Sequence, residues 1–325
     1  GTGESLSSGS SNLYLNDNLT IGNGGTLSSG TGYLEIHEAL ALTGELRQGG
    51  GLLNLIGGGT VGSTGRLDVS HSSLQLGSAL SFAGTLVVNS GTYWSGLGGT
   101  VDLSAGTLES SGGTLNLDQF TTGANTAFKL SGNTEITSSD NMTFGTLDLG
   151  GNRLTLGTGS KGLTLPNTLT MDNVSSAIET KNVNLTLGKA LSLTSGSITS
   201  TGGTLSFSDN LTLGSSGELD VTGSTLSVSG ALDLSSGTFI SSDNNSMLDL
   251  QAATTLSAND QVTGQNPVTF EDVHFNGNVL TLGSASTHLK VNDALALSGI
   301  ALETGAGSLS LSGALALTDN ASLNS

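Results

Sequence analysis

Outward acidic side chains are the first residues of this sequence whose type could support catalysis. Seven acids share one position, between the two apolar residues of a short strand-like pair, which directs them away from a core. They are Glu35, Asp68, Asp102, Asp148, Asp220, Asp233 and Asp249. Glycan-cleaving enzymes need two such carboxylates close together, or carboxylates that hold a cation. Asp220 and Asp233 are 13 residues apart, which does not match the 21-residue period described below. The pattern favours solvated surface charge, with a catalytic pair or a weak cation site as the alternative.

Histidine, cysteine and glycine patterns give no support for a metal or cofactor site. The histidines are His37, His71, His274 and His288, and none stands at metal-ligand spacing from another. The chain contains no cysteine, which excludes disulfides and thiolate ligands. Calcium-binding nonapeptides, EF-hand loops and phosphate-binding loops are all missing from the sequence. The sequence therefore predicts a chain without metal or cofactor that is not an enzyme.

Tyr93 and Trp94 are the one aromatic pair whose position suggests ligand binding. They stand next to Gly96 and Gly98-Gly99, and Trp94 is the single tryptophan of the chain. Exposed rings of this kind stack on sugars, whereas buried rings fill a widened core. Both interpretations stay open, so Tyr93 and Trp94 are weak candidates for a glycan-binding site.

The elements that would position these residues are short strands, each marked by two apolar residues that flank one polar residue. This i, i+2 spacing is typical of a strand, because side chains alternate faces at every residue. Between residues 204 and 250 the pairs are Leu205/Phe207, Leu211/Leu213, Leu219/Val221, Leu226/Val228, Leu232/Leu234 and Leu248/Leu250. They recur at 21 residues, as from Leu205 to Leu226, with about three strands in each period. A unit of this size cannot bury its apolar face alone but can when it stacks on copies of itself.

The periodicity therefore predicts an all-β fold, a parallel β-helix (β-solenoid) of about 15–16 rungs, where a rung is one turn of the coil. Each rung would hold about 20–21 residues and three short strands. Gly, Asn and Asp suit the corners, because they accept backbone conformations that other residues avoid. Stacked asparagines could form side-chain ladders there. The candidates are Asn16-Asp17-Asn18, Ser208-Asp209-Asn210 and Asn276-Gly277-Asn278.

A second, longer repeat predicts the domain organisation. Residues 143–171 match residues 269–297 without a gap at an offset of 126, which is six times 21. Duplication of whole rungs would leave such an offset. We expect residues 1–325 to form one continuous solenoid with irregular rungs near 88–143, where the strand pattern is rougher. We also expect the chain to be a fragment of a longer repeat protein.

Composition and charge restrict the partners. The net charge is −18, only 10% of residues are charged, and 50 residues are glycine. Nucleic acids and anionic membranes need clustered Lys and Arg, of which this chain has eight in all. No apolar run approaches the roughly 20 residues of a membrane helix. We therefore expect no nucleic acid and no membrane insertion.

Repeats such as GSTLSVSGALDLSSGTF, with a Gly/Ser/Thr/Asn/Leu-rich surface, no Cys, few Lys and an acidic pI, resemble the β-solenoid shafts of large bacterial surface proteins. These include filamentous-haemagglutinin-like adhesins and autotransporter passengers. The resemblance covers the whole chain and implies a right-handed parallel β-helix, secretion, and a role as stalk, adhesin or fibre. It carries over no functional residue.

The expected function is a non-enzymatic structural or adhesive shaft at the bacterial cell surface or in an extracellular fibre. Its expected partners are itself, through end-to-end stacking of rungs at open strand edges, or the rest of a longer surface protein, and surface glycans. The alternative is a carbohydrate-active enzyme or a glycan-binding module on the same fold.

Overall fold

A computed structural model describes most of the chain. The described residues are 3–89, 93–96, 98–171, 173–234, 236–241, 246–250, 254–258, 268–270, 272–275, 279–282, 288–304 and 307–324. The side chains at 93–96, 254–258, 269, 274 and 288 lie outside this description. The chain forms two compact units, unit 1 (Gly1–Leu154) and unit 2 (Thr155–Ser325), and each is described by itself.

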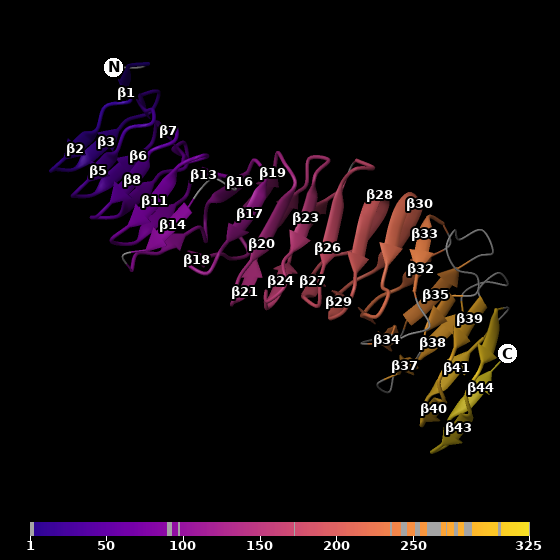
Figure 1. Cartoon of the computed structure of the whole chain (residues 1–325). Coiled ribbons are helices and arrows are strands. Elements are labelled where there is room, and N and C mark those ends of the chain that lie inside the picture. Colours follow the sequence, from indigo (N-terminus) through magenta and orange to yellow (C-terminus); the bar gives the residue numbers. More distant parts are fainter. Residues whose placement is uncertain are drawn as a thin grey trace. The chain divides into compact units, whose positions relative to one another are not determined.

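Unit 1 is a stack of parallel strands in which three sheets each take one strand from successive rungs (Figure 1). Sheet A contains β1 (Ser5–Gly9), β4 (Thr26–Ser29), β7 (Glu45–Gln48), β10 (Arg66–Asp68), β13 (Thr85–Val88), β16 (Thr107–Ser110), β19 (Ala127–Leu130) and β22 (Thr146–Asp148). Sheet B contains β2 (Leu13–Leu15), β5 (Leu34–Ile36), β8 (Leu52–Leu55), β11 (Ser73–Leu76) and β14 (Tyr93–Gly96). Sheet C contains β3 (Leu19–Ile21), β6 (Leu40–Leu42), β9 (Gly59–Val61), β12 (Leu80–Phe82), β15 (Val101–Asp102) and β18 (Phe120–Thr121).

Sheets B and C end at β14 and β18, while sheet A continues beside new strands of unit 1. These are β17 (Gly113–Asn116), which pairs with β20 (Thr134–Thr137), and β21 (Asn141–Thr143). The strand β23 (Arg153–Leu156) spans the boundary between the units.

Unit 2 repeats the arrangement, and two of its strands, β28 and β30, are extended to 10 residues. Sheet D contains β26 (Ala177–Thr180), β28 (Leu191–Ser200), β30 (Leu211–Asp220), β32 (Leu232–Leu234), β33 (Thr238–Ile240), β35 (Thr254–Ala258), β38 (Leu280–Leu282), β41 (Ala301–Glu303) and β44 (Ser322–Asn324). Sheet E contains β24 (Gly162–Leu165), β27 (Asn184–Leu187), β29 (Thr204–Phe207), β31 (Thr225–Val228), β34 (Met247–Leu250) and β37 (Asp272–His274). The remaining strands are β25 (Thr168–Thr170), β36 (Val268–Phe270), β39 (His288–Val291), β42 (Ser308–Leu311), β40 (Leu295–Ser298) and β43 (Leu315–Thr318).

The chain is thus an all-β parallel solenoid of about 13 turns, as the sequence predicts for the fold class. The described residues contain no helix, and so no helix that could cross a membrane. The sequence predicted 15 to 16 rungs of about 20–21 residues, whereas the spacing between paired residues varies from rung to rung, and Leu34 pairs with Leu53 at a spacing of 19. Leu248 pairs with Val273 at a spacing of 25, and Leu256 with Leu282 at 26.

The interior is a set of apolar columns that run from rung to rung. Leu34, Leu53 and Leu74 lie in register on adjacent strands, and each is at most 1% exposed. In unit 2, Leu205 pairs with Leu226 at the 21-residue spacing that the sequence indicated, and both are fully buried. The same period therefore sets the register and the core.

Asparagine and aspartate at the corners hold the next rung through its backbone. Asn18 Oδ1 accepts a hydrogen bond from Ala39 N at 3.0 Å, and Asn210 Oδ1 accepts one from Ala231 N at 2.8 Å. The prediction of asparagine ladders was therefore wrong at these two corners, because alanine occupies the equivalent place in the next rung. A side-chain amide with no amide above it bonds to the backbone instead. Residues 276–278 lie outside the described residues.

Glycine directly precedes five successive strands of sheet A, at Gly25, Gly44, Gly65, Gly84 and Gly106. At Gly44, Gly65 and Gly84 the backbone of the previous rung comes too close for a side chain. A Cβ atom on Gly84 would lie 2.2 Å from the carbonyl oxygen of Gly62 and 2.3 Å from that of Gly65. Both obstacles are backbone atoms, so the rungs would have to separate at this corner.

We predict that Gly84→Ala lowers the free energy of unfolding by about 1–3 kcal/mol, the usual cost of overpacking. Gly22→Ala is the matched control, because a Cβ atom there meets nothing within 4 Å and the residue has no positive φ. The control should stay within about 1 kcal/mol of the wild type. Urea unfolding followed by circular dichroism measures both changes, and equal stabilities would contradict this account of the corner.

Candidate functional site

The seven outward acids lie apart from one another, and none of them is buried. Among the described strand pairs no two of them stand opposite each other; Asp68, for example, pairs with Arg47 and Val87. Side-by-side carboxylates of the kind that glycosidases use are therefore not formed by these seven residues.

Four of the seven acids close the corner that follows their strand. The carboxylates of Asp68, Asp102, Asp148 and Asp220 each accept a hydrogen bond from the backbone N–H two residues on, at 2.9 to 3.1 Å. This is an Asx turn, which substitutes a side chain for part of a backbone turn. The Ser104 hydroxyl and then its N–H lower the pKa of Asp102. The sequence analysis missed this role, although an Asp at a strand end followed by Ser, Thr or Gly was its signal.

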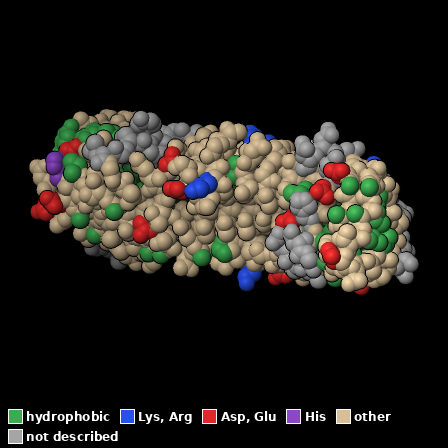
Figure 2. All heavy atoms as spheres, turned by 90° about the horizontal axis from the view of Figure 1, so that it is seen from below, with side chains coloured by type: hydrophobic (Ala, Val, Ile, Leu, Met, Phe, Trp, Pro, Cys, Tyr) green, Lys and Arg blue, Asp and Glu red, His purple; other side chains and the backbone are tan. Residues whose placement is uncertain are grey.

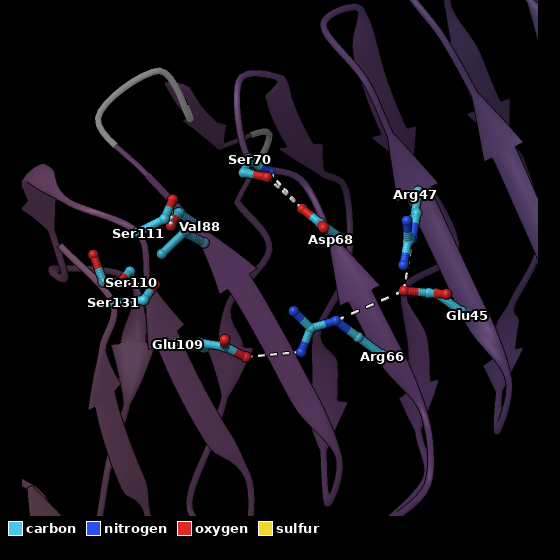
Figure 3. A network of polar contacts seen from close by, with 10 residues as sticks. All are labelled: Glu45, Arg47, Arg66, Asp68, Ser70, Val88, Glu109, Ser110, Ser111 and Ser131. Atoms are coloured by element: carbon cyan, nitrogen blue, oxygen red, sulfur yellow. Dashed lines mark hydrogen bonds and ion pairs between the residues drawn. The ribbon is translucent and has the colours of Figure 1, made fainter. Parts of the chain in front are cut away.

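A charged network lies on the outer face of sheet A (Figure 3). Arg47 Nε lies 2.7 Å from Glu45 Oε1, Arg66 Nε lies 3.7 Å from the same oxygen, and Arg66 Nη1 lies 2.7 Å from Glu109 Oε2. The hydrogen bond to Glu45 raises the pKa of Arg47. Exposed pairs of this kind contribute about 0–1 kcal/mol each. Because each of these guanidinium groups has a carboxylate partner, we interpret the network as a set of ion pairs that stabilises the packing of neighbouring rungs.

A second network, which we name the tyrosine cluster, lies on the outer face of sheet B. Its members are Tyr14, Tyr33, Glu35, His37 and Asn54. Tyr14, Glu35 and Asn54 occupy one outward column, since they are in register on β2, β5 and β8. Tyr33 and His37 are two residues before and after Glu35, which places them on the same face.

Glu35 is the centre of the tyrosine cluster. Its Oε2 accepts hydrogen bonds from the Tyr33 hydroxyl and from Asn54 Nδ2, the latter at 2.8 Å. Its Oε1 lies 2.5 Å from His37 Nε2. These donors lower the pKa of Glu35, the Tyr33 hydroxyl most of all, followed by Asn54. Burial and the bond to Glu35 raise the pKa of Tyr33.

The aromatic part of the cluster is open to solvent. The Tyr14 side chain is 56% exposed, and its ring centroid lies 5.5 Å from that of Tyr33 at a tilt of 48°. The sequence analysis treated Glu35 as solvated charge and His37 as isolated. The missed signal was the i, i+2 spacing of Tyr33, Glu35 and His37 together with the 21-residue offset from Tyr14 to Glu35.

Asn54 carries a buried polar atom without a partner. The residue is 5% exposed, Nδ2 donates to Glu35 and to Tyr33 Oη, and Oδ1 has no hydrogen bond. A buried acceptor left unsatisfied costs about 1–3 kcal/mol. Stability alone therefore does not account for an asparagine at this position.

The remaining sequence candidates lie elsewhere. Tyr93 and Trp94 open β14, the last strand of sheet B, where Trp94 holds the register position of Leu74. Their side chains lie outside the described residues, so the glycan-binding prediction for this pair stays a prediction. His71 forms a corner with φ of 69°, and His274 stands in register with Asp249. Among the described residues, no three His, Cys, Asp or Glu side chains gather closely enough to hold a metal.

The end strands of both units leave apolar side chains uncovered. Leu315 and Leu317 of β43 are 40% and 46% exposed, although their register partners Leu295 and Leu297 are at most 1% exposed. In unit 1, Leu6 of β1 is 62% exposed beside a groove of about 390 Å³ that Leu19, Ile21 and Leu27 help to line.

By its fold, the chain belongs to the class of parallel β-solenoid repeat proteins. Comparisons with protein-family models, curated proteins and solved structures find no match to this chain. The functional conclusions below therefore depend on its own residues.

We predict that the tyrosine cluster makes stability depend on pH through Glu35. The folded pKa lies below the ordinary 4.5, so the unfolded chain takes up the proton first as the pH falls. The contribution of the Glu35 charge to the free energy of unfolding is complete above about pH 5 and is lost as the pH falls through the folded pKa. Urea midpoints at about pH 7, 4 and 3 should show the advantage of the wild type over Glu35→Gln shrinking with acidification.

Glu38→Gln is the matched control, because it removes an exposed carboxylate three residues away. Its urea midpoint should change with pH as that of the wild type does. If the difference in urea midpoint between Glu35→Gln and the wild type stayed constant over the whole pH range, the charge of Glu35 would have no role in the network.

Proposed function

We propose that this chain is a non-enzymatic shaft segment of a bacterial surface structure or extracellular fibre, to which further rungs add at the uncovered end strands. In this proposal the rungs come from a second copy or from a longer parent chain, and the protein acts outside the cell. The shafts of filamentous-haemagglutinin-like adhesins and autotransporter passengers, which the sequence resembles, suggest the same role.

The observation that carries the proposal is the change in exposure along one register column. Leu297 is fully buried because β43 covers it, whereas Leu317, one rung further, is 46% exposed. Leu302 and Leu323 repeat the change, from 0% to 41%. Another rung of the same kind would bury these side chains and pair the free backbone groups of the end strand.

The rest of the described surface supports a structural role. Figure 2 shows mainly uncharged polar side chains and backbone, with single acidic and basic residues scattered over it. Four of the seven outward acids act in corners, and the arginines Arg47 and Arg66 are paired with glutamates. Such a surface keeps a long stack soluble without providing a reaction centre.

The lowered pKa of Glu35 argues against a hydrolase at the tyrosine cluster. A general acid needs a raised pKa, so that it holds its proton near neutral pH. The adjacent outward positions on sheet B belong to Tyr14, Asn54 and Gln75, none of which can act as a second carboxylate.

We predict that the purified chain assembles end to end as salt rises. Copies with a charge of −18 repel one another, and the screening length falls from about 30 Å at 0.01 M salt to about 10 Å at 0.1 M. Negative-stain electron microscopy and light scattering should show single particles at low salt and fibres of constant width at higher salt.

The double variant Leu315→Lys, Leu317→Lys should remain as single particles, because lysines at inward positions of the end strand prevent a further rung from stacking. The matched control places lysine at Ala296 and Ala316, which are exposed outward positions, and changes the charge equally. The control should assemble like the wild type. Fibres formed by the leucine variant, or a wild type that stays single at every salt concentration, would overturn the proposed assembly.

A further inference from the structure

We infer that the tyrosine cluster on the outer face of sheet B is a binding site for a neutral saccharide. This inference deepens the adhesive part of the proposed function by naming a ligand class. It depends on that proposal only for its biological setting, because the cluster lies within one unit and needs no second copy.

The first support is the exposed ring of Tyr14. The C–H face of a pyranose ring stacks on an aromatic side chain whose other end remains in water. Tyr14 is 56% exposed, and Asn12 Nδ2 lies 3.4 Å from its hydroxyl oxygen. The ring packs at a tilt against Tyr33, which limits its motion and so lowers the entropy that a bound sugar would have to remove.

The second support is the fixed set of polar groups beside that ring. Glu35 accepts three hydrogen bonds from the protein, whereas a carboxylate has about four acceptor sites. His37 is exposed and contacts Glu35 through Nε2, so its Nδ1 is not engaged in that contact. Sugar hydroxyls both donate and accept hydrogen bonds, which matches a carboxylate, an imidazole nitrogen and a phenol on one face.

The third support is the unsatisfied Asn54 Oδ1. Purely structural networks satisfy their buried atoms, and exceptions call for an explanation. Here the asparagine positions Glu35 and Tyr33 through Nδ2 while its own oxygen stays unpaired. An asparagine whose Nδ2 holds Glu35 and Tyr33 in place, while its Oδ1 makes no hydrogen bond, is consistent with a residue that positions ligand-binding groups.

Other ligand classes fit less well. An anionic polysaccharide would meet Glu35 and a chain of charge −18. A quaternary ammonium ligand needs ring faces that converge around it, whereas Tyr14 and Tyr33 contact each other at 5.5 Å. Metal binding lacks ligands, because Glu35 and His37 are the only such side chains in the cluster.

Sheet B also carries the remaining tyrosine and the tryptophan of the chain. The chain has three tyrosines and one tryptophan. Tyr14 lies on β2, Tyr33 directly precedes β5, and Tyr93 and Trp94 begin β14 of the same sheet. Addition of a further rung to β2 would extend the edge of this sheet and leave its outer face open.

The test is binding of a panel of neutral sugars to the intact chain, measured by saturation-transfer NMR and calorimetry. The panel contains glucose, galactose, mannose and N-acetylglucosamine with their short oligomers. One or more should bind, and Tyr14→Ala should weaken that binding at least ten-fold. Tyr14→Phe, which keeps the ring, should retain most of the affinity, and Glu35→Gln should weaken it without changing the circular dichroism spectrum.

Val174→Ala is the matched control, because it removes another highly exposed apolar side chain, and it should bind as the wild type does. Binding that survives Tyr14→Ala and is lost in Trp94→Ala would overturn the inference and place the site on β14. Absence of binding by the whole panel at up to about 10 mM, ten times a weak dissociation constant of 1 mM, would overturn it as well. The assembly-blocked variant Leu315→Lys, Leu317→Lys should bind sugar normally, which separates failure of this inference from failure of the proposed assembly.

Discussion

The backbone hydrogen bonding between successive rungs is the constraint on which the rest of the structure depends. Parallel strands stack about 4.8 Å apart, and each rung must present the same register as its neighbours. Leu13, Leu34, Leu53 and Leu74 form one unbroken column under this constraint. The described corners preserve that register, and the charged network and the tyrosine cluster occupy outer faces that the register leaves free.

The corners show how the register is preserved. Glycine at residues such as Gly84 permits backbone to lie against backbone, and asparagine at residues such as Asn210 binds the N–H of the following rung. The Asx turns of Asp68 and Asp102 end their strands at fixed points. These three devices use small or acidic residues, so a chain with much glycine and a strong negative charge is partly a consequence of its corners.

The sequence predicted the core well because burial in a strand leaves a periodic trace. Leu205, Phe207, Leu226 and Val228 were assigned to the interior from spacing alone, and all are at most 1% exposed. The tyrosine cluster was not predicted, because it joins three rungs, and contacts between rungs depend on the register of each one. Asn54 stands 19 residues after Glu35, whereas Tyr14 stands 21 before it, so no single period reveals the group. The corner role of Asp148 was missed for a different reason, since its signal is the local pair Asp148 and Gly150 at a strand end and not the 21-residue period.

The direction of the hydrogen bonds has a mechanical consequence. Within each unit the bonds between rungs run along the stacking direction, so a pull on the end of the chain peels off the end rung and opens its bonds before those of the next rung. Release of a single 21-residue rung frees a chain that extends to about 70 Å, compared with the 4.8 Å that it occupied in the stack. Under tension such a molecule lengthens in steps and dissipates work at each one, and most of its remaining rungs stay folded meanwhile.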